Sequence, residues 1–172
     1  MKKNQLGQLI GGLFGLAFIQ ANAGALPQAL SVPLRVVAVA AFLGLFLSIR
    51  RNSGEPAPGA DFGRNYRYVV AAEVIAGFGG AAVLTNVLDT PRATVGWIAL
   101  VVGVHFFGLA VVWRMPALHV LATAMSVCGA AGMALAIGGA SAATVAAVAG
   151  VAPGALLLAA AWRGAARPAV AA

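Results

Sequence analysis

The chain has 172 residues, of which 62% are hydrophobic and only 9% are charged. This number of charged residues is too small to supply the solvated surface of a water-soluble domain. The composition therefore excludes a soluble globular protein and indicates that lipid covers most of the surface. The formal net charge of +7 would favour nucleic-acid binding in a soluble protein. Here the basic residues lie mostly between apolar segments, so no nucleic-acid partner is expected.

Six apolar segments follow one another along the chain, and each is close to the roughly 20 residues that a transmembrane helix needs. We therefore predict an all-α, polytopic transmembrane bundle of six helices, forming a single membrane domain over residues 1–172. Pro153 lies inside the last segment and predicts a kink or a local opening of that helix. The expected spans are 6–26, 34–49, 68–88, 93–113, 117–137 and 142–162.

The distribution of lysine and arginine predicts the orientation, because positively charged connectors stay on the cytoplasmic side. With a cytoplasmic N-terminus, nine basic residues are cytoplasmic, namely Lys2, Lys3, Arg50, Arg51, Arg64, Arg67, Arg114, Arg163 and Arg167. Only Arg35 and Arg92 then lie outside. We expect both termini in the cytoplasm, a flexible cytoplasmic loop at 50–67, and a location in the inner or plasma membrane of a bacterium.

The first apolar segment allows a second interpretation. It follows Lys2 and Lys3 and ends at Ala-Asn-Ala (21–23), a pattern that also precedes signal-peptide cleavage. Cleavage there would leave five spans, starting from Gly24. The same segment carries Gly7, Gly11 and Gly15 at four-residue spacing, which lets another helix approach closely and favours a retained first helix.

Glu73 and His105 are the main candidates for a functional site, because ionisable side chains inside a membrane span are costly. Glu73 follows Arg67 by six positions, or about 9 Å along a helix, and His105 precedes Arg114 by nine, or about 13 Å. A short connector makes the third and fourth spans antiparallel neighbours, so the two side chains should lie at similar depth. They form either a structural polar clamp or a site that binds a substrate or relays a proton.

Three further polar residues are secondary candidates: His119, Asn86 and Gln20. His119 begins the fifth span and joins a proton path only if it faces His105, whereas the other two would polarise the outer ends of the first and third spans. Two histidines without metal-binding spacing give little support to a metal site, and Cys128 is the single cysteine. No metal and no other cofactor is expected.

Three hypotheses about function remain open. The leading one is a transporter or channel for a small solute or ion, with Glu73 and His105 as its polar residues. The second is a non-catalytic scaffold or accessory subunit whose glycine and alanine faces bind another membrane helix or a second copy of the chain. An intramembrane enzyme, with Ser126 as nucleophile and His105 as base, is the weakest, because neither a nucleophile elbow nor a P-loop is present.

Overall fold

The computed structural model describes residues 3–51 and 63–166, and within them it is all-α. Six helical segments are long and apolar enough to cross a membrane, as the sequence predicts. The first ends in a 3₁₀ turn, Ala23–Ala25, and the last is built from two α-helices joined by a π-helical turn. The α-helices are α1 (Lys3–Asn22), α2 (Gln28–Arg51), α3 (Arg64–Asn86), α4 (Ala93–Val112), α5 (Ala117–Ile137), α6 (Ala142–Ala146) and α7 (Ala152–Ala166).

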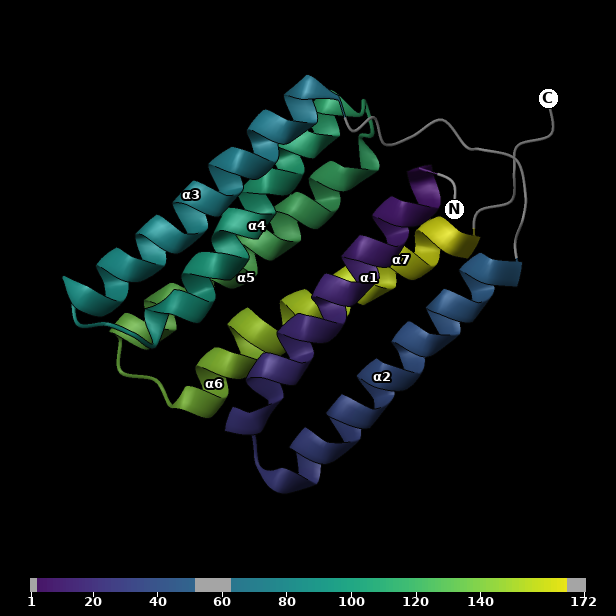
Figure 1. Ribbon diagram of the computed structural model, residues 1–172. Helices are drawn as coiled ribbons and strands as arrows, with labels where there is room; N and C mark the ends of the chain where they lie inside the picture. The colour runs from purple at the N-terminus through teal and green to yellow at the C-terminus, as the bar shows by residue number, and fades with distance from the viewer. Residues whose placement is uncertain (1–2, 52–62, 167–172) are drawn as a thin grey trace.

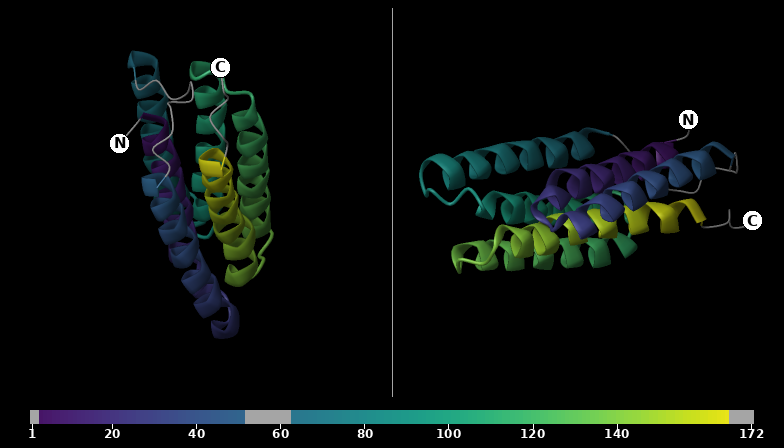
Figure 2. Two further views of the ribbon diagram at one scale, coloured as in Figure 1. Left: turned by 90° about the vertical axis from the view of Figure 1, so that its right-hand side faces the viewer. Right: turned by 90° about the horizontal axis from the view of Figure 1, so that it is seen from below.

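The long helices run along a common direction and form two groups of three (Figures 1 and 2). In one group α4 lies between α3 and α5, and in the other α1 lies between α2 and α7. The groups meet where α5 packs against α7 and against the π-helical turn before it. Among the described residues, the end of the bundle where α3 and α5 begin carries six arginines: Arg50, Arg51, Arg64, Arg67, Arg114 and Arg163. We call it the arginine-rich end; α2, α4 and α6 begin at the opposite end.

Glycines bring two pairs of helix backbones into direct contact, one pair in each group. A Cβ added at Gly15 of α1 would lie 2.7 Å from the carbonyl oxygen of Gly154 in α7. A Cβ at Gly96 of α4 would lie 2.7 Å from the carbonyl oxygen of Gly129 in α5. Lipid gives helices little hydrophobic reason to associate, so this close packing holds the helices together within each group.

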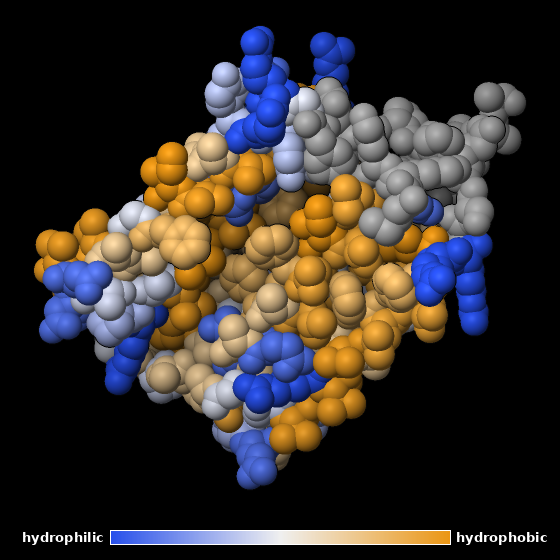
Figure 3. All heavy atoms as spheres, in the orientation of Figure 1, coloured by the Kyte–Doolittle hydropathy of each residue, from blue (hydrophilic) through white to orange (hydrophobic). Residues whose placement is uncertain are grey.

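The surface of the molecule matches a membrane environment. Large apolar side chains are exposed along the helices, and in α3 only Leu84 is buried. Hydrophobic atoms form a broad band on the face shown in Figure 3, and most of the strongly hydrophilic groups lie around its margins. Because α3 packs mainly against α4, most of its remaining surface is open to lipid.

The second span differs from its predicted boundaries. It begins at Gln28 and not at residue 34, because the backbone N–H groups of Leu30 and Ser31 bond to the carbonyl oxygen of Pro27 and start the helix there. Pro33 lies inside the helix without ending it, which membrane helices tolerate. Residues 50–51 and 64–67, expected in the loop, are helical. The predicted flexibility of the loop concerns 52–62, outside the described residues.

The last span contains the local opening that Pro153 predicts. A π-helical turn, Ala147–Val151, separates α6 from α7 and ends two residues before this proline. The side chain of Asn22, near the end of α1, lies against Gly150 in the turn, where no Cβ would fit. At the start of α6, Ser141 accepts a hydrogen bond from the backbone N–H of Thr144 at 3.1 Å, as expected of an N-cap.

Candidate functional site

Glu73 and His105 lie side by side between α3 and α4. The Glu73 Oε2 and His105 Nδ1 atoms are 3.1 Å apart, and the side chains are 22% and 10% exposed. Glu73 follows the first residue of α3 by nine positions, or about 14 Å, which places it well inside the span. The predicted proximity of these two residues is therefore present in the structure.

The contact needs a proton. The Nδ1 atom of His105 is buried and has no hydrogen-bond partner among the described residues. A neutral ring that donates through Nε2 presents only a lone pair at Nδ1, and an ionised carboxylate presents only lone pairs. Two such acceptors repel at 3.1 Å, so a proton belongs on Glu73 or on Nδ1. The approach lacks hydrogen-bond directionality and is best described as a close electrostatic contact.

A small residue in α4 permits the pair to form. A Cβ at Gly108 would lie 2.9 Å from a methyl carbon of Val69, so glycine lets α3 and α4 approach beside His105. Val69 is one helical turn before Glu73, so its contact with Gly108 sets the register of the two helices at the site.

Aromatic side chains enclose the pair along the α3–α4 interface. Toward the arginine-rich end, the rings of Tyr66 and Trp113 stack with centroids 5.9 Å apart. Toward the opposite end, Trp97 packs on Gly80 and donates a hydrogen bond from Nε1 to the backbone oxygen of Ala76 at 3.0 Å. The acidic and basic groups are thus bracketed by rings on both sides.

Trp97→Phe is expected to destabilise the protein by about 0.6 to 2 kcal/mol, because phenylalanine keeps the ring but cannot donate to Ala76. Thermal unfolding in detergent measures the loss. Trp162→Phe is a matched comparison, since Trp162 donates a bond of the same length, 3.0 Å, to Ala41 across α7 and α2. If only Trp162→Phe lowers the unfolding temperature, the α3–α4 bond is not formed in solution.

The secondary candidates lie elsewhere. His119 in the first turn of α5 is exposed and meets the ring of Phe107 edge-on, with centroids 5.8 Å apart. Asn86 is exposed and bonds the carbonyl oxygen of Ala82 in its own helix. Gln20 bonds Arg35 between α1 and α2. No ion pair or hydrogen bond among the described residues links these three to Glu73 or His105.

The enzyme and metal hypotheses find no assembled site in the described residues. Ser126 lies against Gly103 on the α4–α5 interface, whereas His105 faces α3. In the described part of the chain, no three His, Cys, Asp or Glu side chains gather in a way that would hold a metal ion. Glu73 and His105 are the one acid–base pair that the described residues bring together.

Two structural features, one beside this pair and one at the α1–α2 turn, were not anticipated from sequence. The bond from Trp97 to Ala76 depends on the α3–α4 register, which the sequence of neither helix gives. Arg35 had served only in the charge count, although its place inside an apolar segment was itself a signal.

Comparison of the chain with protein-family models, with curated proteins and with solved structures finds no match in any of the three.

Proposed function

We propose that this multi-span membrane protein moves a small solute or ion across the bilayer, and that the pair of Glu73 and His105 exchanges a proton during transport. The observation that carries the proposal is the 3.1 Å approach of a carboxylate oxygen and an imidazole nitrogen within a membrane span. Such an approach is favourable only when a proton lies on one of the two atoms, and histidine is the side chain that gains and loses a proton near neutral pH.

Loss of that proton would leave one negative charge inside the membrane, and an uncompensated charge there costs about 2.5 to 3.5 kcal/mol or more. A cation that reaches Glu73 would remove this cost, and so would a returning proton. Proton and cation therefore compete for one carboxylate, which is the physical basis of exchange. The 22% exposure of Glu73, against 10% for His105, makes the carboxylate the more accessible partner.

The proposal includes an orientation. One end of the described bundle carries six arginines, and the other carries two, Arg35 and Arg92. The positive-inside rule then places the arginine-rich end, with both chain termini, in the cytoplasm. In that orientation Glu73 and His105 lie in the cytoplasmic half of the membrane.

Proteoliposomes that contain the full chain and a trapped pH-sensitive dye test transport directly. An imposed pH gradient is challenged with sodium, potassium, methylammonium or tetraphenylphosphonium, and protein-free liposomes serve as the control. We expect at least one of these cations to dissipate the gradient faster with protein than without. The proposal is contradicted if liposomes with and without protein dissipate the gradient at the same rate for all four cations, and also when a membrane potential is imposed without added cation.

A second function has one specific observation in its favour. Gly77 and Gly79 of α3 have no atom within 4 Å of an added Cβ, so this helix offers an open small-residue surface. Such a surface would suit an accessory subunit or a homo-oligomer that packs through α3. Gly79→Leu would then reduce the mass of the assembled complex in detergent, measured by sedimentation. If the protein is a monomeric transporter, the mass would not change.

A further inference from the structure

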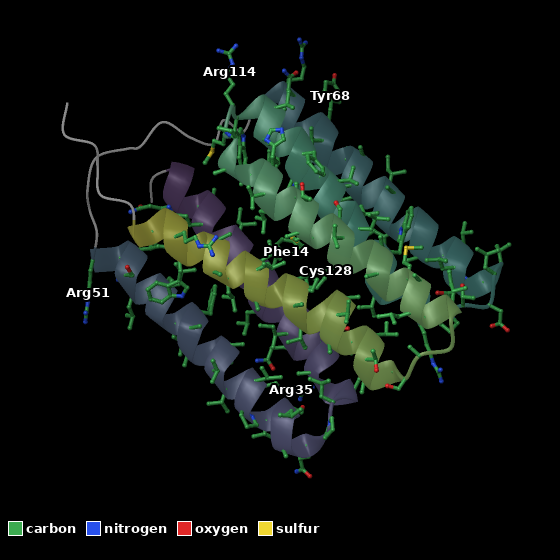
Figure 4. The ribbon with its side chains drawn as sticks, turned by 180° about the vertical axis from the view of Figure 1, so that it is seen from behind. Phe14, Arg35, Arg51, Tyr68, Arg114 and Cys128 are labelled. Carbon is green, nitrogen blue, oxygen red and sulfur yellow. The ribbon has the colours of Figure 1, made fainter. Side chains whose placement is uncertain are left out.

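Arg35 is an arginine inside a membrane-spanning helix. It follows the first residue of α2 by seven positions, or about 10 Å. Helical side chains point toward the N-terminus of their helix, which directs Arg35 toward the α1–α2 turn. Figure 4 shows Arg35 close to this turn, at the end of the molecule away from Arg51 and Arg114.

Neighbouring groups hold the side chain in place. Arg35 Nη2 donates a hydrogen bond to the backbone oxygen of Gln20 at 3.2 Å, and Gln20 Nε2 donates one to the backbone oxygen of Arg35 at 3.1 Å. A Cβ at Gly24 would lie 2.9 Å from Nη2, so the glycine makes room for the guanidinium. These contacts fix the position of the cation at the junction of α1 and α2.

The positive charge is not compensated by the part of the chain that the structure describes. No carboxylate among residues 3–51 and 63–166 forms an ion pair with Arg35. The Nε atom is buried and has no hydrogen-bond acceptor. A guanidinium has five N–H donors, and Gln20 accepts from one of them. A held, partly buried cation with unused donors needs an anion.

We propose that Arg35 binds a phosphate group at the α1–α2 turn. Phosphate oxygens match the planar donors of a guanidinium better than they match a lysine ammonium. The side chain points from the apolar span toward the membrane surface, where phospholipid headgroups carry phosphate. A phospholipid headgroup and free inorganic phosphate share this chemistry.

Native mass spectrometry of the full chain in a maltoside detergent measures binding, with phosphatidylglycerol and inorganic phosphate as separate probes. A galactosyl diacylglycerol with the same acyl chains is the phosphate-free control. We expect the wild-type protein to bind phosphatidylglycerol in preference to the galactolipid. If excess inorganic phosphate displaces the lipid, free phosphate occupies the site as well; if it does not, the ligand is the lipid headgroup.

Arg35→Gln is expected to weaken phosphatidylglycerol binding by about tenfold or more, since hydrogen bonds to a charged group contribute about 1.5 kcal/mol or more. Arg92→Gln is the matched control, because Arg92 is exposed at the same end of the bundle and should bind lipid as before. Equal binding by the Arg35 and Arg92 variants would overturn the proposal. If Arg35→Gln does not fold, the binding of the two lipids to the wild-type protein decides. A wild-type protein that does not prefer phosphatidylglycerol over the galactolipid also overturns the proposal.

Discussion

Glu73→Gln is expected to abolish cation-driven dissipation of a pH gradient, reducing the rate in proteoliposomes to that of protein-free vesicles. Glutamine has nearly the shape of glutamate, so packing at the α3–α4 interface should survive. It can neither release a proton nor hold a cation with a negative charge. Transport should be lost while the unfolding temperature in detergent stays close to that of the wild-type protein.

Asp89→Asn is the matched control, because it removes a carboxylate of the same charge from an exposed position between α3 and α4. This variant should transport at the wild-type rate. Wild-type rates in Glu73→Gln, or an equal loss in both variants, would show that the carboxylate inside the span is not the site of exchange. His105→Gln separates the partners, since it keeps the carboxylate and should alter the pH dependence of the rate.

Gly129→Val is expected to be the most destabilising single substitution at the helix interfaces. Its Cβ would collide with the backbone nitrogen of Leu100 and lie 2.7 Å from the carbonyl oxygen of Gly96. These are backbone atoms of α4, so α4 and α5 must move apart along their whole contact. Overpacking of this kind costs about 1 to 3 kcal/mol or more, and should lower the unfolding temperature in detergent.

Gly11→Val in α1 provides the comparison, because a Cβ at Gly11 meets no atom within 4 Å. Both variants place the same β-branched residue in a helix, so the intrinsic cost of valine cancels. Gly11→Val should unfold near the wild-type temperature. Equal stability of the two variants would mean that the direct backbone contact between Gly96 and Gly129 is absent in the purified protein.

Local sequence signals predicted the spans well, because a transmembrane helix is defined by the length and polarity of its own segment. The predicted boundaries 117–137 coincide with α5, and the opening signalled by Pro153 is present as a π-helical turn. The second span was predicted to begin six residues too late, at residue 34, because its start depends on backbone hydrogen bonds to Pro27 and not on apolar composition alone.

The candidate site was predictable only in part. Counting residues from Arg67 and Arg114 placed Glu73 and His105 at similar depth, and a short connector made their helices antiparallel neighbours. The same counting cannot rank Gln20 and Asn86, because it does not show which side of a helix meets a neighbour: Gln20 bonds Arg35 of α2, whereas Asn86 bonds Ala82 in its own helix. That choice is made by backbone contacts distant in sequence, such as Gly15 with Gly154.

Titration of the protein in lipid bilayers by solid-state NMR tests the central claim most directly. Isotope labels on glutamate and histidine report the carboxyl group of Glu73 and the ring nitrogens of His105 between pH 5 and 8. If the two groups share one proton, both signals change together with pH, and Glu73→Gln alters the titration of His105. Signals that titrate independently, or an unchanged His105 titration in Glu73→Gln, would contradict a shared proton and with it the proposed mechanism of exchange.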